Sequence, residues 1–250
     1  MLIYIDNDIL LNSYVPGIIG SLIAGFLSIG IIETYRYFKI KIQHRKFNKI
    51  FGYYKTEKLY LVLPSLQIRS EIQTQYGYPL MKYGGAYIRS SKLLAYADAV
   101  SLKYLIDLVS KIVGSKSIIS TDEDLKNELD LSFISFGGSN FYCTYILSQS
   151  DNKFYSFDGN KIINNQTSKE FEDDGVNDYG FVIKYKHINF PKKTWIIIAG
   201  LGETGTRGAA WFLATNWKKL AEKYSDNSFG FVVKVTPGID GTAILVDENE

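Results

Sequence analysis

The chain has 250 residues, with 28 Lys and Arg against 26 Asp and Glu, and its formal net charge is +2. This length suits one sizeable domain with an appendage, and a hydrophobic share of 46% excludes a disordered chain, whose composition is poor in apolar residues. One cysteine and two histidines exclude an internal disulfide framework and a His/Cys zinc site, so we expect neither a metal site nor a cofactor.

The N-terminal segment holds a long uncharged run. Residues 14–32 (YVPGIIGSLIAGFLSIGII) carry no charge, and as a helix they extend roughly 28 Å, about the hydrocarbon thickness of a bilayer. Asp6 and Asp8 precede the run, where a signal peptide has positive charge. We therefore expect a transmembrane helix within residues 1–35. A buried helix of a soluble core is the alternative.

Basic residues follow this run. Six Lys and Arg lie between positions 36 and 49, and the positive-inside rule places the N-terminus outside and the rest in the cytoplasm. We expect residues 36–50 to form a basic juxtamembrane stalk and residues 51–250 a cytoplasmic domain at the cell inner membrane. The net charge then divides into +3 for residues 1–50 (six basic, three acidic) and −1 for residues 51–250 (22 basic, 23 acidic).

Small residues recur at steps of three and four within the run, which places them on one helix face. This spacing lets membrane helices approach closely, so we expect a homo-oligomer. The residues assigned to oligomerisation, or to the lining of a pore, are Gly17, Ser21, Ala24, Gly25 and Ser28. The alternative is a plain tether whose small residues make no such contact.

Strands and helices alternate in the rest of the chain. Apolar runs of β type predict strands at residues 59–63, 117–120, 131–136, 154–157, 161–163, 180–185, 194–199, 229–235 and 242–246. Helical spacing of apolar residues predicts helices at residues 91–113, 141–147 and 208–224. The expected fold class is α/β: an N-terminal transmembrane helix followed by a Rossmann-like three-layer α/β domain with antiparallel edge hairpins.

Three of the expected strands run into loops rich in Gly, Ser, Thr or Arg and then into helices. The carboxyl ends of parallel strands share one edge of a sheet, so these loops would converge on one crevice. Helix N-termini there favour anions, which points to a nucleotide or oligonucleotide ligand. The expected ligand-binding residues are Arg89, Ser91, Gly138, Ser139, Asn140, Gly202, Thr204, Gly205, Thr206 and Arg207.

Two features of the last loop have competing interpretations. Gly200, Gly202 and Gly205 satisfy G-x-G-x-x-G, but the next expected strand ends in Lys234-Val235 and not in an acidic residue, so we do not expect NAD chemistry. A glycine-rich turn that serves only helix packing is the alternative. Glu203 is the only carboxylate in these loops and is the catalytic candidate if the protein is an enzyme, although no partner base is identifiable. A solvated loop glutamate is the alternative.

The uncharged run at residues 14–32, the basic flank to Lys49 and the loops at 137–140 and 200–207 together resemble, by architecture only, membrane effectors of bacterial antiphage nucleotide-signalling systems, such as those of the Hailong type. The resemblance implies that a partner nucleotidyltransferase makes a nucleotide signal, that the domain senses it, and that the membrane part disrupts the bilayer or conducts ions. We therefore expect a membrane-anchored oligomeric effector of antiphage defence rather than an enzyme. The alternatives are a membrane-tethered, glycohydrolase-like enzyme that degrades a nucleotide with Glu203, and a protein-binding scaffold.

Overall fold

The computed structural model describes residues 7–53, 57–67, 80–83, 86–89, 92–113, 117–126, 128–149 and 151–250. The chain divides into two units, Met1–Arg45 and Lys46–Glu250. Arg89 lies in a described strand without a described side chain, and Ser91 lies outside the described residues. In the first unit, side chains are described at Ser21 and from Gly25 onward, which leaves those of Gly17 and Ala24 outside the description.

The N-terminal helix α1 (Asn7–Phe51) has 45 residues. Where its side chains are described, the uncharged stretch of residues 25–32 ends at Glu33, and Arg36, Lys39 and Lys41 follow. Within the described part of the chain, no helix combines the length and the apolar character needed to cross a membrane.

The expectation of a transmembrane helix is therefore wrong. The single-pass inner-membrane location, the outside N-terminus, the cytoplasmic assignment of the domain and the ion-channel function depended on it and are corrected with it. A span needs about 20 predominantly apolar residues. An uncharged segment is not necessarily apolar enough to span a membrane. In residues 14–32, four glycines, two serines, a proline and a tyrosine interrupt the apolar side chains.

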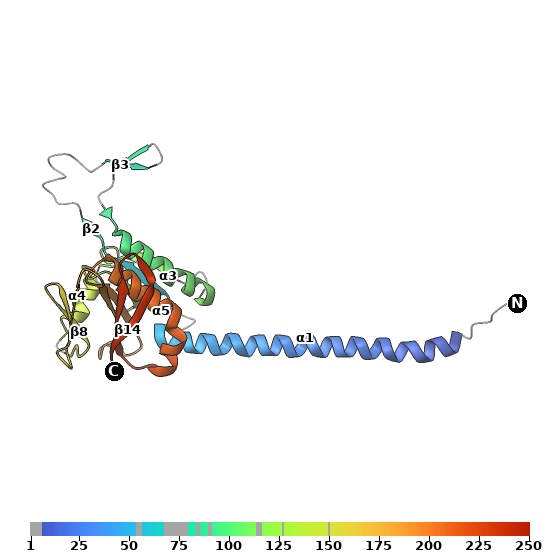
Figure 1. The fold of residues 1–250 in the computed structure, drawn as a ribbon. Coiled ribbons are helices and arrows are strands. Elements are labelled where there is room, and N and C mark those ends of the chain that lie inside the picture. Colours follow the sequence, from blue (N-terminus) through green and yellow to red (C-terminus); the bar gives the residue numbers. More distant parts are fainter. Residues whose placement is uncertain are drawn as a thin grey trace. The chain divides into compact units, whose positions relative to one another are not determined.

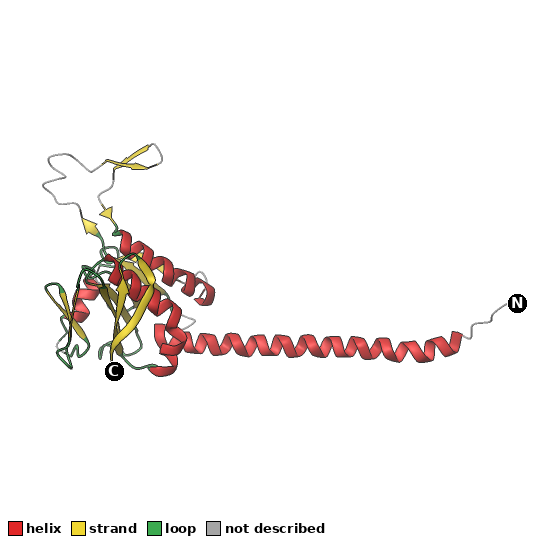
Figure 2. Ribbon diagram, viewed as in Figure 1, coloured by secondary structure: helices red, strands yellow, loops and turns green. Residues whose placement is uncertain are grey.

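The second unit is built on a seven-stranded sheet with the order β14-β13-β11-β12-β7-β1-β6. Four neighbours in it are parallel: β12 (Trp195–Gly200), β7 (Ser132–Phe136), β1 (Leu59–Leu63) and β6 (Ser117–Thr121). The other three are antiparallel to their neighbours: β11 (Asp178–Tyr185), β13 (Phe229–Thr236) and β14 (Ile239–Asn249). Figure 2 shows these strands in yellow between red helices.

Smaller elements complete the described part of the chain. Three short strands form a second sheet: β8 (Tyr155–Asp158), β9 (Lys161–Asn164) and β10 (Glu170–Glu172). Two-stranded pairs join β2 (Leu66–Gln67) to β5 (Lys92–Leu93) and β3 (Leu80–Tyr83) to β4 (Ala86–Arg89). The helices of this unit are α3 (Tyr96–Val113), α4 (Phe141–Leu147) and α5 (Glu203–Lys223).

Two hydrophobic clusters cover the two faces of the large sheet, so the unit has three layers (Figure 1). Side chains of α3, α5 and the last turn of α1 pack on one face, and those of α4 and β8–β10 pack on the other. Strand β7 shows the alternation that this arrangement requires: Phe133 joins the second cluster, whereas Ile134 and Phe136 join the first.

The end of α1 belongs to the core of the second unit. Phe47, Ile50 and Phe51 are fully buried, and the ring of Phe47 lies 5.8 Å from that of Trp217. The buried ammonium of Lys184 donates to the backbone carbonyl of Lys49, one of the carbonyls that the end of a helix leaves unpaired. These contacts anchor the end of α1.

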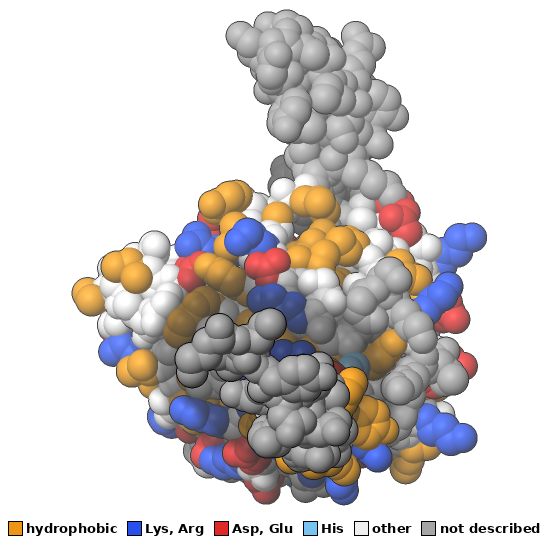
Figure 3. All heavy atoms as spheres, turned by 90° about the vertical axis from the view of Figure 1, so that its right-hand side faces the viewer, with side chains coloured by type: hydrophobic (Ala, Val, Ile, Leu, Met, Phe, Trp, Pro, Cys, Tyr) orange, Lys and Arg blue, Asp and Glu red, His pale blue; other side chains and the backbone are white. Residues whose placement is uncertain are grey.

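The structure corrects the expected fold class: it is mixed α/β with a seven-stranded sheet and four described helices, none of which is long and apolar enough to cross a membrane. Helix α5 begins at Glu203 and not at Gly208, so most of the expected glycine-rich loop is helical. On the face drawn in Figure 3, the Lys and Arg side chains are interspersed with Asp and Glu, in keeping with the nearly balanced charge of residues 51–250.

Candidate functional site

The loops after β1, β7 and β12 lie side by side, because these three strands are parallel neighbours in the sheet. We call this region the carboxyl edge. Two hydrogen bonds join the loop after β7 to the neighbouring strands: the backbone N–H of Gly137 donates to the Ile198 carbonyl of β12 (2.9 Å), and Nδ2 of Asn140 donates to the Val62 carbonyl of β1 (3.2 Å). Ligands of open α/β sheets bind at such edges.

The loop after β7 holds three of the expected ligand-binding residues. Asn140 is fully buried and caps α4, because its Oδ1 accepts the N–H of Tyr142 (3.0 Å). An added Cβ at Gly138 would lie 3.3 Å from the ring of Phe157, so a larger residue would press on that ring. Ser139 is exposed. Of these three residues, Ser139 presents a side chain to solvent.

The N-terminus of α5 is already occupied by a carboxylate of the same chain. Asp178, which is 5% exposed, accepts the N–H of Gly202 at 3.1 Å and that of Gly205 at 2.6 Å. An added Cβ would lie 2.6 Å from Asp178 Oδ2 at Gly202 and 2.2 Å from the Tyr179 carbonyl at Gly205. The carboxylate stands where a phosphate would bind, and the two glycines permit its close approach.

The side chains that follow these glycines have partners within the chain. Arg207 forms a two-pronged ion pair with Asp240, at 2.6 and 3.0 Å, and the hydrogen bond to Asp240 raises the pKa of Arg207. Thr206 Oγ1 donates to the Gly202 carbonyl (3.3 Å), and Thr204 Oγ1 accepts the N–H of Gly238 (3.4 Å). These three residues would have to give up internal contacts to hold a ligand.

The helix α4 is covered in a similar way. Asp122 accepts the N–H of Phe141 at 3.0 Å and that of Ser65 at 2.9 Å, which ties the loop after β6 to those after β7 and β1. Carboxylates therefore occupy the helix N-termini at which an anion was expected. The chemistry of the carboxyl edge favours ligand groups that donate hydrogen bonds, such as hydroxyl and amino groups, over phosphate.

Asp98 is the residue of this edge that the sequence analysis missed. It lies in the first turn of α3, is 5% exposed, and accepts no hydrogen bond from any other residue that the structure describes. Burial, and then the charge of Glu203, raises the pKa of Asp98 to about 6. An aspartate in a first helical turn is common, so the sequence alone gave no reason to single it out.

Gly137 makes room for the Asp98 carboxyl group. Its φ of +82° lies in the region that favours glycine, and an added Cβ would lie 2.8 Å from Asp98 Oδ2. The structure thus brings Asp98 to the loop after β7, within electrostatic range of Glu203 at the start of α5. A carboxyl group whose pKa is near 6 can give or take a proton near neutral pH. Among the described residues, no three His, Cys, Asp or Glu side chains form a group that could hold a metal.

No protein-family model, no curated protein and no solved structure matches this chain.

Ser21, Gly25 and Ser28, assigned from the sequence to oligomerisation or a pore, lie in α1 and are exposed. An added Cβ at Gly25 would meet no atom within 4 Å.

Proposed function

We propose that the α/β unit binds the nucleoside part of a nucleotide-type ligand at the carboxyl edge and serves as the sensing part of an oligomeric effector. The Asp98 carboxyl group supports this proposal, because it is 5% exposed, no described residue donates a hydrogen bond to it, and its oxygens are not among the fully buried atoms without a partner, so a ligand can reach them. Ribose hydroxyl and base amino groups supply such donors, and Asp98 and Glu203 receive them. The phosphates lie away from Gly202 and Gly205, whose N–H groups Asp178 already holds.

The wider setting is proposed from the resemblance. A partner nucleotidyltransferase supplies the nucleotide or oligonucleotide signal, and the protein responds in antiphage defence. The correction of the expected transmembrane helix removes one of the features that carried the resemblance, and the loops at residues 137–140 and 200–207 remain. The sensing step can be tested without this setting.

Calorimetric titration of the full chain tests the binding. The four ribonucleosides, their 5′-monophosphates and cyclic dinucleotides are the probes. We expect at least one to bind, and we expect Asp98→Asn to weaken its binding about tenfold or more, because the amide has lost one acceptor oxygen. Asp107→Asn is the matched control, since Asp107 lies on the same helix but is exposed. Absence of binding by every probe, or equal binding by Asp98→Asn and wild type, contradicts the proposal.

A second candidate function is hydrolysis of the nucleotide's glycosidic bond. The observation in its favour is the raised pKa of Asp98 beside a second carboxyl group, since pairs of acids in unlike environments are typical of acid–base catalysis. In this reaction Asp98 protonates the departing base, and the Glu203 carboxylate stabilises the positive charge on the ribose or activates the attacking water. The bond from C1′ to the base breaks, and a bond from C1′ to the water oxygen forms. The proton that the water loses passes to Glu203 or to solvent, and Asp98 regains a proton from solvent.

Chromatography of the incubated ligand separates the two candidates. A hydrolase releases free base, loses this activity in Glu203→Gln and still binds the ligand. A sensor returns the ligand unchanged. If base is released equally by wild type and Glu203→Gln, the catalytic role of Glu203 is wrong.

Self-association of the chain also remains a proposal, supported by apolar side chains of α1. Phe26, Leu27 and Ile31 are 74, 62 and 68% exposed, and such surface is commonly covered by a partner, here a second copy. Light scattering after size exclusion is expected to show an oligomer that Leu27→Glu with Ile31→Glu dissociates. Ile239→Glu, at an exposed isoleucine of β14, is the control. A wild-type monomer at all concentrations, or binding to lipid vesicles in place of self-association, contradicts this proposal.

A further inference from the structure

A pocket lies at the end of the parallel strands opposite the carboxyl edge, and the proposed function does not use it. Its volume is about 380 Å³, within the range of small-molecule sites. Three charged residues of its lining each stand two positions before a strand: Glu57 before β1, Asp130 before β7 and Lys193 before β12. Because these strands are parallel neighbours, their register brings the three side chains together. We call this region the amino edge.

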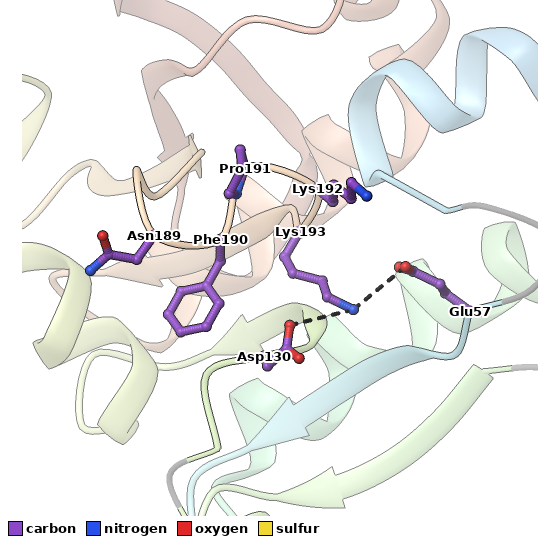
Figure 4. A pocket seen from close by; sticks show the side chains of 7 residues that line it. All are labelled: Glu57, Asp130, Asn189, Phe190, Pro191, Lys192 and Lys193. Carbon is purple, nitrogen blue, oxygen red and sulfur yellow. Dashed lines mark hydrogen bonds and ion pairs between the residues drawn. The ribbon is translucent and has the colours of Figure 1, made fainter.

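Lys193 extends between the two acids, as Figure 4 shows. Its Nζ lies 3.5 Å from Oε1 of Glu57 and 3.7 Å from Oδ1 of Asp130. Both distances are long for charge-assisted hydrogen bonds, which measure about 2.7–2.9 Å. The ammonium group therefore retains capacity to donate to a further acceptor.

The second oxygen of Glu57 lacks a donor. Oε2 is buried and accepts no hydrogen bond from the residues that the structure describes. A buried carboxylate oxygen in this state is unfavourable, and a ligand N–H or O–H would relieve it. The ligand's donor should be neutral, because a cation at Oε2 would be repelled by the neighbouring ammonium of Lys193.

An apolar wall stands beside these charges. The ring of Phe190 lies 5.7 Å from that of Trp195 and 5.6 Å from that of His187. The N–H of Lys193 donates to the Phe190 carbonyl (2.9 Å), which closes the turn that carries the ring. The wall is therefore held in place without a ligand. Lys192, the next cation of the lining, is exposed and has no ion pair with any described residue.

We propose that this pocket binds an N-acylated amino acid, either free or as the C-terminal residue of a peptide. In both, an amide N–H, a carboxylate and a side chain are attached to one carbon atom. The amide N–H donates to Oε2 of Glu57 once that side chain, which is 31% exposed overall, turns the oxygen toward the pocket. The carboxylate pairs with Lys192 and Lys193, and an apolar side chain lies against Phe190. Each group of the ligand meets a group of the pocket that lacks a full set of partners.

N-acetyl-L-phenylalanine is the probe, titrated calorimetrically into the full chain. We expect it to bind at least tenfold more tightly than 3-phenylpropanoate, which lacks the amide N–H. We expect the same advantage over N-acetyl-L-phenylalaninamide, which lacks the carboxylate. A probe that does not bind, or three compounds of equal affinity, would falsify the proposal.

Variants locate the binding. Glu57→Gln and Lys192→Ala are each expected to weaken binding of the probe about tenfold. The controls Glu172→Gln and Lys219→Ala change exposed residues elsewhere and are expected to leave binding of the probe unchanged. If Glu57→Gln fails to fold, Lys192→Ala decides, because its side chain is exposed. Full-strength binding by Lys192→Ala overturns the proposal.

An acetylated tripeptide ending in Phe distinguishes the two sources of the ligand. If it binds more tightly than the probe, the natural ligand is a peptide C-terminus, and if it binds more weakly, the ligand is a free acyl-amino acid.

Discussion

At the carboxyl edge Asp178 accepts hydrogen bonds from three backbone N–H groups, those of Tyr179, Gly202 and Gly205, whereas at the amino edge Glu57 and Asp130 share the ammonium of Lys193. Both oxygens of the Asp178 carboxylate accept hydrogen bonds, but one Glu57 oxygen is buried without a donor. The two ends of one set of parallel strands thus differ in how their acids are satisfied. At the carboxyl edge, where helices begin, free backbone N–H groups donate to the acidic side chains. At the amino edge, where strands begin, side chains must supply these donors.

Loss of Asp178 is expected to have the largest effect on stability. Asp178→Ala leaves the N–H groups of Gly202 and Gly205 without their acceptor, and hydrogen bonds to a buried charge are worth about 2 kcal/mol each. We expect the free energy of unfolding to fall by about 4 kcal/mol, measured by urea denaturation. Asp107→Ala, at an exposed position, serves as the control. A loss below 1 kcal/mol would mean that Asp178 is not the acceptor that holds the start of α5.

Asp98, the carboxyl-edge acid without a described donor, has the next largest expected effect. Its pKa is raised from 3.8 to about 6 by burial and then by Glu203. Between about pH 4 and 6 the folded state therefore holds a proton that the unfolded state has lost, so the free energy of unfolding falls as the pH rises through this window. A pKa shift of two units corresponds to about 3 kcal/mol in the free energy of unfolding. The chain has lost all of this stabilisation above pH 6.

Asp98→Asn is expected to remove this pH dependence and to stabilise the chain at pH 7. Urea denaturation at pH 4, 5, 6 and 7 measures both effects, with Asp107→Asn retaining the wild-type profile. A variant that is more stable yet binds ligand more weakly would mark Asp98 as a residue retained for function. Identical pH profiles for wild type and Asp98→Asn would show that the carboxyl group titrates normally.

A smaller effect is expected from filling the space beside Asp178. Gly205→Ala places a Cβ 2.2 Å from the Tyr179 carbonyl, so the backbone must shift, at a cost of about 2 kcal/mol. Gly241→Ala is the matched control, because its added Cβ would meet its nearest neighbour, Trp211, at 3.8 Å. Thermal unfolding compares the two variants. Equal melting temperatures would contradict the role of Gly205 in close packing.

The smallest effect is expected at the amino edge. Asp130 is 71% exposed and lies 3.7 Å from Lys193, so Asp130→Ala should cost at most about 0.5 kcal/mol. Together with Asp178→Ala, this variant measures the difference between the edges directly. A loss above 1 kcal/mol for Asp130→Ala would show that the ion pairs of the amino edge are as important as the hydrogen bonds of the carboxyl edge.

Local pattern was sufficient for several elements. The helix expected at residues 141–147 coincides with α4, because Asn140 is a strong N-cap residue and its side chain does accept the N–H of Tyr142. The hairpin around Asp158-Gly159 joins β8 to β9, with Gly159 at a φ of +60°. The strand β10 was missed, because its three residues, Glu170–Glu172, include two exposed glutamates and a single apolar residue.

The uncharged N-terminal run was judged by the absence of charge, and this was too weak a criterion for a membrane span. The start of α5 was placed five residues too late for a different reason. Glycines at residues 200–208 predict a loop on local grounds, whereas Asp178, 24 residues before Gly202, supplies the acceptor that lets the helix begin at Glu203. No local pattern contains that contact.

The sequence by itself determined that residues 59–250 build an α/β unit and that three of its strands lead into loops rich in glycine and serine. Both follow from periodicity and capping, which are local properties. Only the tertiary structure decided which groups at those loops are left to bind a ligand. Asp178 and Arg207 have partners 24 and 33 positions away, and Asp98 owes its raised pKa to burial and to Glu203. Hydrogen bonding and burial of a polar group depend on neighbours in space, which are distant in sequence.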